Sequence, residues 1–347
     1  MVSDALLQRW LERVLVLRPG EGWALAWSFG YFFCLLAAYY VLRPLRDEMG
    51  IAGGVRNLQW LFTATFVAML AAVPVFGAMV ARLPRRRFVP LVYHFFVANI
   101  AIFWLLLTFD IGTVHVARVF FVWISVFNLF AVSVFWSFMA DLFASEQGKR
   151  LFGFIAAGGS AGALLGPALT VRLAVPLGPV NLLFVAALFL ELAVLCARRL
   201  ESVAASVGSA PLAPAAAAAL GGGWFAGIAM VLRSPYLAGI ALWVMLLSLA
   251  GTFLYFQQAN IVAAASDDPG VRTRIFATID LAIGILTIIV QFFATGRLMA
   301  RFGVGRAAAV LPLVFGLGFL ALAFTPMLLV VIAFQALQRT ANFALSN

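Results

Sequence analysis

The sequence has few charged residues, and this scarcity excludes most soluble folds. Only 10% of its 347 residues are charged, and 65% are hydrophobic. A soluble domain carries about 25% charged and about 45–50% apolar residues. Apolar stretches of about 20 residues recur along the chain, and each is long enough to cross a bilayer. The sequence therefore predicts an all-α, polytopic membrane protein with no room for a sizeable soluble domain.

Residues that build catalytic or metal centres are also scarce. The two cysteines, Cys34 and Cys196, lie inside apolar stretches, and the two histidines, His94 and His115, lie near the ends of different ones. Neither histidine has a nearby partner with the spacing of a zinc site. The sequence also lacks the Gly-x-x-x-x-Gly-Lys-Ser/Thr loop of nucleotide hydrolases. We therefore expect no cofactor, no metal and no enzymatic activity.

Lysine is almost absent, and the arginines lie mostly between apolar stretches. The net charge is +10, and Lys149 is the single lysine. Nucleic-acid binding needs a basic face on a soluble fold, so we expect no such partner. With the N-terminus placed in the cytoplasm, basic residues on the cytoplasmic side outnumber those outside by about two to one, which predicts this orientation.

The hydropathy pattern predicts ten spans in two groups. Residues 1–21 are typical of an amphipathic helix on the cytoplasmic surface. The stretch 199–234, which contains a run rich in Ala, Gly and Pro, predicts a linker. It separates a six-helix half at 22–198 from a four-span half at 235–347. The predicted spans are 22–43, 58–81, 88–108, 115–140, 151–172, 179–198, 236–258, 274–297, 305–325 and 326–345.

The second span of each half ends in the same pattern of glycine and arginine. We expect the glycine to permit close helix packing. The spacing resembles the loop signature of the major facilitator superfamily, although the Asp of that signature is missing from both copies. The resemblance implies two repeated halves around a midplane site and twelve spans, so we expect the sequence to be truncated; a genuine ten-span protein is the alternative. The matching residues are Gly77, Arg82 and Arg87, and Gly296, Arg301 and Arg306.

The outer end of the first span carries the strongest local signal. Arg43, Arg46, Asp47 and Glu48 cluster there, and Pro44 is expected to interrupt the helix. Arginine binds phosphate or carboxylate through two parallel hydrogen bonds. The alternative is an outer loop in which the arginine pairs with Asp47 or Glu48. The residues leave both interpretations open.

The connection between spans four and five carries the second signal, with Asp141 near the membrane boundary and Lys149 and Arg150 after it. A charged turn is the alternative interpretation. Together the stretches Leu-Arg-Pro-Leu-Arg-Asp and Gly-Lys-Arg-Leu-Phe-Gly resemble the ATP/ADP antiporter family of plastids and obligate intracellular bacteria, in its free-living bacterial branch. The resemblance implies nucleotide exchange across a bacterial inner membrane. It makes Arg46 a phosphate contact with Arg43 beside it, and it also matches Asn260.

Glycines in span five form a stripe at every fourth position. Gly158, Gly162 and Gly166 have this spacing. Residues four apart share one face of a helix, and small residues let two helix backbones approach closely. We predict that this stripe packs against a neighbouring helix.

Buried polar residues suggest further site positions. Arg339 lies in mid-span, where a charge costs roughly 2.5–3.5 kcal/mol and normally faces a cavity or a partner. Asp280 is a candidate for that partner or for proton coupling, with structural pairing as the alternative. Tyr39 and Asn128 are candidates to line a cavity in the first half, with packing as the alternative.

These residues predict an alternating-access transporter of a small anionic solute such as ATP or ADP. Arg43, Arg46 and Arg339 would neutralise the anion, and Asp47, Asp141 and Asp280 would couple, gate or pair with them. Lys149 and Arg150 are further candidates to couple or gate. We expect a monomer whose other partner is the lipid bilayer. The alternatives are a proton-coupled symporter or efflux carrier for another solute, and a non-transporting sensor or structural subunit.

Overall fold

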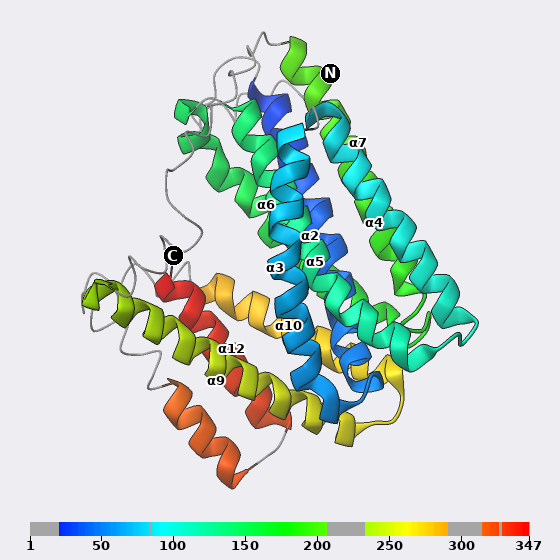
Figure 1. Ribbon diagram of the computed structural model, residues 1–347, viewed down its shortest axis with the longest axis vertical. Helices are drawn as coiled ribbons and strands as arrows, with labels where there is room; N and C mark the ends of the chain where they lie inside the picture. The colour runs from blue at the N-terminus through cyan, green and yellow to red at the C-terminus, as the bar shows by residue number, and fades with distance from the viewer. Residues whose placement is uncertain are drawn as a thin grey trace. The chain divides into compact units, whose positions relative to one another are not determined.

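The computed structural model describes residues 21–82, 85–143, 145–206, 233–290, 314–325 and 328–346. Every regular element in these ranges is a helix, as the sequence predicts (Figure 1). Besides an apolar helix at Val314–Phe324, the elements are α2 Glu21–Ala52, the short 3₁₀ helix η1 Val55–Asn57, α3 Leu58–Arg82, α4 Arg85–Thr108, α5 Thr113–Leu142, α6 Ser145–Leu173, α7 Leu182–Ser206, α9 Pro235–Ala265, α10 Pro269–Val290 and α12 Leu328–Ser346.

Seven helical segments in the described part of the chain are long and apolar enough to cross a membrane. They match predicted spans one to five, seven and eight, and so confirm those spans by length and composition. α7, the helix Val314–Phe324 and α12 coincide with the other three predicted spans, which stay predictions. The seven segments are Glu21–Ala52, Val55–Met79, Phe88–Thr108, Thr113–Leu142, Arg150–Leu173, Pro235–Ala265 and Pro269–Val290.

Several predictions fall outside the described residues and stay predictions. They are the amphipathic segment up to residue 20, the linker at 207–232, and the loop residues Gly296, Arg301 and Arg306. The side chains of Arg82, Arg87, Lys149 and Arg339 also lie outside the described part, although their backbones are helical.

Two predicted helix ends were wrong. α2 does not stop at Pro44 but continues to Ala52. Proline removes one backbone donor, yet Leu42 and Leu45 on either side of it are fully buried, so tertiary packing holds the helix together. α7 likewise continues past residue 198 to Ser206, because Leu200 is buried in the same core.

The described helices form two compact units. The first comprises residues 1–212 together with 268–278, and the second comprises 213–267 together with 279–347. The boundary between them therefore falls inside α10. The domain boundaries predicted at 198 and 235 stay a prediction.

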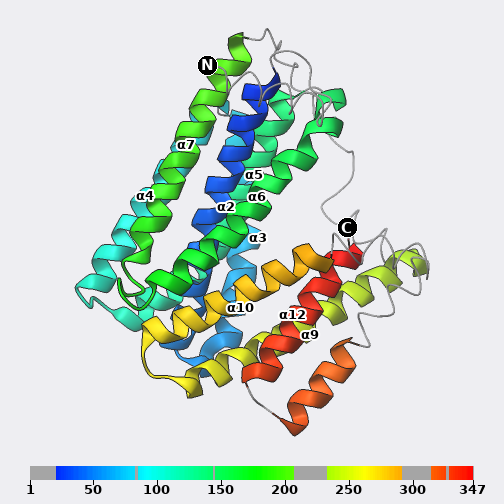
Figure 2. The same cartoon turned by 180° about the vertical axis from the view of Figure 1, so that it is seen from behind.

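In the first unit α2 packs against α5, α6 and α7, α3 packs against α5, and α4 packs against α5 and α7 (Figure 2). The core among these helices is rich in aromatic rings, such as Phe32 stacked on Phe135 at 4.1 Å. It also contains a buried polar chain. The Tyr31 hydroxyl donates to the Tyr93 hydroxyl at 2.7 Å, and the Tyr93 hydroxyl donates to the Ala131 carbonyl at 3.1 Å. This chain ties α2, α4 and α5 together.

The glycine stripe of α6 lies directly against α2, which confirms the predicted packing face. A Cβ atom on Gly158 would lie 2.6 Å from the Phe29 carbonyl oxygen, and one on Gly166 would lie 2.8 Å from the Ala37 carbonyl oxygen. A Cβ on Gly162 would overlap the backbone of α2. Only glycine leaves room for this approach, which is the way that helices pack closely in lipid.

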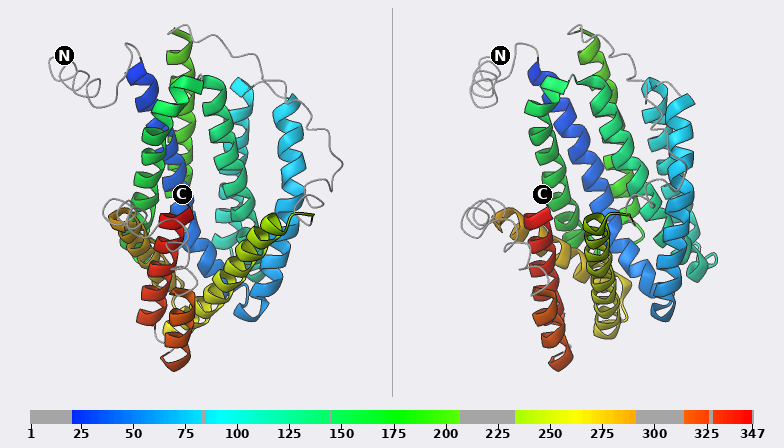
Figure 3. Two further views of the ribbon diagram at one scale, coloured as in Figure 1. Left: turned by 90° about the vertical axis from the view of Figure 1, so that its left-hand side faces the viewer. Right: turned by 60° about the vertical axis from the view of Figure 1, so that its left-hand side comes forward.

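In the second unit α12 lies beside α9 (Figure 3). A small apolar cluster joins Leu254 of α9, Phe315 and Leu322 of the helix Val314–Phe324, and Val331 and Phe334 of α12. This apolar cluster holds the three helices together.

Candidate functional site

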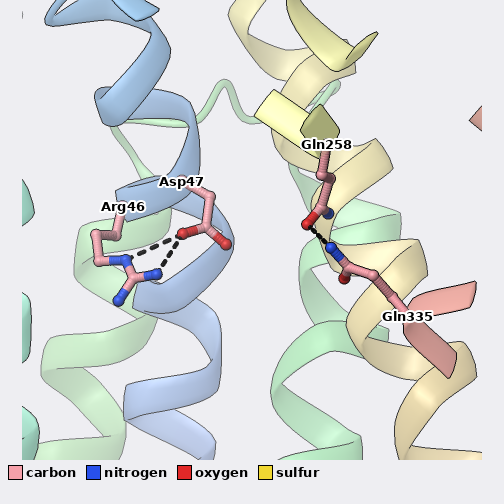
Figure 4. Close-up of polar contacts among 4 residues, drawn as sticks. All are labelled: Arg46, Asp47, Gln258 and Gln335. Carbon is pink, nitrogen blue, oxygen red and sulfur yellow. Dashed lines mark hydrogen bonds and ion pairs between the residues drawn. The ribbon is translucent and has the colours of Figure 1, made fainter. Parts of the chain in front are cut away.

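The last three turns of α2 carry the predicted anion-binding residues Arg43 and Arg46. Because α2 continues past Pro44, these residues lie on a helix and not on the loop that one interpretation assumed. The Arg46 guanidinium donates from Nε and Nη2 to Asp47 Oδ1 at 3.0 and 2.7 Å (Figure 4). Its central carbon also lies 5.0 Å from the centre of the Phe121 ring of α5, a distance typical of a cation–π contact. Local pairing of Arg46, left open by the sequence, is therefore observed.

Arg43 lies one turn earlier on the same helix and contacts an aromatic ring. Its guanidinium carbon is 5.5 Å from the centre of the Tyr40 ring. Tyr39 is half-buried and meets Tyr40 edge to face at 5.2 Å. The end of α2 thus presents two arginines whose charges are supported by neighbouring rings.

A buried ion pair joins α2 to α10, and the sequence did not predict it. Arg272 Nε lies 2.9 Å from Glu48 Oε2, and the two side chains are only 13% and 1% exposed. Asp268 caps the start of α10 by accepting from the backbone N–H groups of Gly270 and Val271 at 2.6 and 3.0 Å. A buried carboxylate persists only with a compensating partner. Arg272 is that partner for Glu48, and their contact fixes the position of Arg272.

The opposite end of α2 carries a second buried carboxylate. Glu21, the first residue of α2, accepts hydrogen bonds from Arg150 Nη2 at 3.1 Å and from Gln147 Nε2 at 3.0 Å. Arg150 was predicted to couple or gate, and in the structure it ties the start of α6 to the start of α2. An acidic residue at the beginning of an apolar span was the sequence signal that could have pointed to this pair.

Three other predicted residues of the first unit differ in burial. Asn128 is half-buried on α5, and Asp141 is exposed near the end of the same helix. The role of Gly77 in close helix packing stays a prediction. Within the described part of the chain no atom lies within 4 Å of a Cβ built on Gly77, and the face of α3 around it is exposed.

In the second unit the predicted residues occupy different environments. Asn260 is exposed on α9, and its Nδ2 donates to the Phe256 carbonyl of its own helix at 2.8 Å. Asp280 is buried on α10, with 7% of its surface exposed. The predicted pairing of Asp280 with Arg339 involves a side chain outside the described residues.

An amide pair in the second unit was not among the predicted site residues. Gln335 Nε2 of α12 donates to Gln258 Oε1 of α9 (Figure 4). Both side chains are buried. Two glutamines in apolar spans were visible in the sequence, but their adjacency depends on the packing of α9 against α12.

Comparison with solved structures identifies the fold. The chain is similar to the crystal structure of a D-xylose–proton symporter, with a TM-score of 0.55 and 15% identity over 92% of this chain and 79% of that one. It is also similar to a bacterial homolog of the human lysosomal transporter Spinster in an inward-facing, unoccupied conformation, with a TM-score of 0.49 and 15% identity over 95% of this chain and 74% of that one. No family model and no curated protein match the sequence. The all-helical architecture and the symporter match together show a major-facilitator-type fold, which confirms the predicted fold class.

Proposed function

We propose that this chain is an alternating-access transporter of a small anionic solute, with exchange of ATP against ADP as the specific case. The observation that carries the proposal is Arg46, which is held half-buried on α2 by Asp47 and the Phe121 ring. Within a major-facilitator-type fold, a guanidinium held in this way is suited to receive an anion during the transport cycle. The proposal also follows the sequence resemblance to the nucleotide antiporters.

The Arg46–Asp47 contact offers a way to exchange one anion for another. A guanidinium stays charged at all physiological pH values, so its charge needs a counter-ion throughout the transport cycle. Asp47 supplies that counter-ion in the structure. A phosphate or carboxylate of the solute would compete for the same N–H donors, because these groups accept hydrogen bonds in the same forked geometry. Arrival of a solute anion would then release Asp47, and departure would restore the pair.

The Glu48–Arg272 pair supports a conformational cycle. It connects α2 to the first turns of α10, and α10 continues from the first unit into the second. Two buried charges compensate each other only while they remain in contact. A transport step that separates α10 from α2 must therefore break this pair and expose both charges to water. The intact pair would then mark one end state of the transport cycle.

Counterflow in proteoliposomes tests the proposal. Vesicles loaded with ADP should take up labelled ATP in a saturable manner, and the Arg46→Ala variant should lose this uptake while remaining folded and inserted. Arg56→Ala is the matched control, because Arg56 follows α2 on η1 and is exposed. Full uptake by Arg46→Ala would remove the anion site from α2. No uptake by folded wild-type protein would remove nucleotide exchange.

A proton-coupled carrier for another solute is the second candidate, and Asp280 favours it. This carboxyl group is buried inside a candidate membrane span, where a titratable side chain is commonly part of a proton relay. If this candidate is correct, an imposed pH gradient should drive uptake of the solute, and Asp280→Asn should abolish that dependence. If uptake by wild type and by Asp280→Asn is equally independent of the pH gradient, the proton-coupled carrier is excluded.

A further inference from the structure

The two glutamines of the amide pair in the second unit lie equally far from an end of their helices. Gln258 lies seven residues before the end of α9, and Gln335 lies seven residues after the start of α12. At 1.5 Å per residue, each amide is about 10 Å from its helix end. α9 is a candidate membrane span, and the residues around Gln335 are apolar. Both amides are therefore well inside apolar segments, where a polar group costs free energy unless it is hydrogen-bonded.

The pair does not satisfy its own hydrogen-bonding groups. Gln335 Nε2 donates to Gln258 Oε1 (Figure 4), but Gln335 Oε1 is buried and accepts no hydrogen bond within the described part of the chain. The two side chains are 2% and 3% exposed. Turning both amides over would leave a donor unpaired in place of the acceptor. Among the described residues, either arrangement leaves one buried polar atom without a partner, which costs free energy in the solute-free protein.

We infer that Gln258 and Gln335 form a contact for a hydroxyl group of the transported solute. This inference rests on the proposed transport function and concerns an uncharged part of the solute. A hydroxyl group both donates and accepts, so it pairs with the unsatisfied atom in either amide arrangement. Neutral amides give little stabilisation to an anion compared with a guanidinium. The solute class is therefore an anion that also carries hydroxyl groups, as the ribose of a nucleotide does.

A purely structural tie between α9 and α12 makes the opposite prediction for the empty protein. Glutamine side chains do hydrogen-bond across helices in membranes and stabilise them slightly. If that is the role of the pair, replacing both glutamines lowers stability. If the pair is held for a solute, replacing both with apolar side chains of similar size removes an unsatisfied buried group and raises stability, as expected of residues kept for function.

The melting temperature of the purified, solute-free protein separates these roles. The Gln258→Met/Gln335→Met variant should melt higher than wild type by roughly 2 °C or more. Gln257→Met is the matched control, because Gln257 is the neighbouring glutamine on α9 and is exposed. An unchanged or lower melting temperature in the double variant would overturn the inference, whatever the protein transports.

Binding of two probes tests the hydroxyl contact directly. ATP and inorganic tripolyphosphate both carry three linked phosphates, but only ATP carries hydroxyl groups outside them. Gln335→Met should weaken ATP binding by roughly tenfold, the loss expected for one hydrogen bond, and leave tripolyphosphate binding unchanged. Arg46→Ala should weaken both probes. An unchanged preference for ATP in Gln335→Met would overturn the hydroxyl contact. If wild type binds neither probe, the nucleotide proposal fails, and the melting experiment alone decides the role of the amides.

Discussion

α2 in the first unit and α9 in the second are both long apolar helices, yet different contacts hold them. α2 meets the glycine stripe of α6 backbone to backbone and carries a buried, paired carboxylate at each end. α9 meets α12 through an apolar cluster and one amide pair. In lipid there is no hydrophobic drive between helices, so close packing and polar contacts decide which helices stay together.

The difference between these contacts is a difference in the cost of separation. Leaving one charge of a buried ion pair without its partner costs about 3–5 kcal/mol, whereas an interhelical hydrogen bond in a membrane is worth about 0.6 kcal/mol. The contacts of α2 therefore resist separation more strongly, and the amide contact of α9 can exchange partners at little cost. The following predictions test this comparison from the largest expected effect to the smallest.

Breaking the buried ion pair should have the largest effect. Arg272→Met leaves Glu48 buried without a charged partner and should lower the free energy of unfolding by about 3–5 kcal/mol. The double variant Glu48→Met/Arg272→Met removes both charges and should recover most of that loss. Tryptophan fluorescence during unfolding in detergent measures both. Equal destabilisation of the single and double variants would show that charge compensation is not what the pair contributes.

Adding one methyl group to the glycine stripe should have the next largest effect. Gly162→Ala forces α6 away from the backbone of α2 and should cost roughly 1–3 kcal/mol of unfolding free energy. Gly153→Ala is the control on the same helix, because no atom lies within 4 Å of its added Cβ. The control should be neutral or more stable by up to about 1 kcal/mol, since alanine favours helix. Equal effects in the two variants would contradict close packing as the cause.

Removing a neutral hydrogen bond inside the first unit should have a smaller effect. Tyr93→Phe deletes the hydroxyl that links Tyr31 to the Ala131 carbonyl and should cost about 1–2 kcal/mol. Tyr236→Phe is the control, because Tyr236 is 76% exposed on α9. Thermal unfolding of the two variants provides the measurement. If Tyr93→Phe leaves thermal stability unchanged, the polar chain of the first unit contributes as little to stability as the amide pair of the second.

The smallest effect on stability is expected at Asn260. Its side chain is exposed and bonds only to its own helix among the contacts described here, so Asn260→Ala should change the unfolding free energy by less than about 0.5 kcal/mol. If Asn260 contacts solute, as the family resemblance implies, ATP uptake should nevertheless fall. Unfolding and counterflow measured on one preparation separate the two roles, and a stable variant with unchanged uptake would remove Asn260 from the site.

Local rules predicted some features correctly and failed at others for identifiable reasons. The stripe at Gly158, Gly162 and Gly166 was predictable, because helical periodicity alone places these residues on one face. Pro44 was misleading because burial of its neighbours outweighs one lost backbone hydrogen bond. The packing role of Gly77 stays a prediction, because a small residue permits close packing but does not by itself supply a neighbouring helix.

The sequence by itself determined the all-helical class, seven candidate spans and the packing face of α6, because each depends on length, composition or periodicity within one segment. Only the tertiary structure decided that Glu48 pairs with Arg272, Glu21 with Arg150 and Gln258 with Gln335. Each pair joins two helices that are distant in sequence. A buried polar side chain requires a partner wherever it lies, but its identity depends on which helices pack together, and no single segment contains that information.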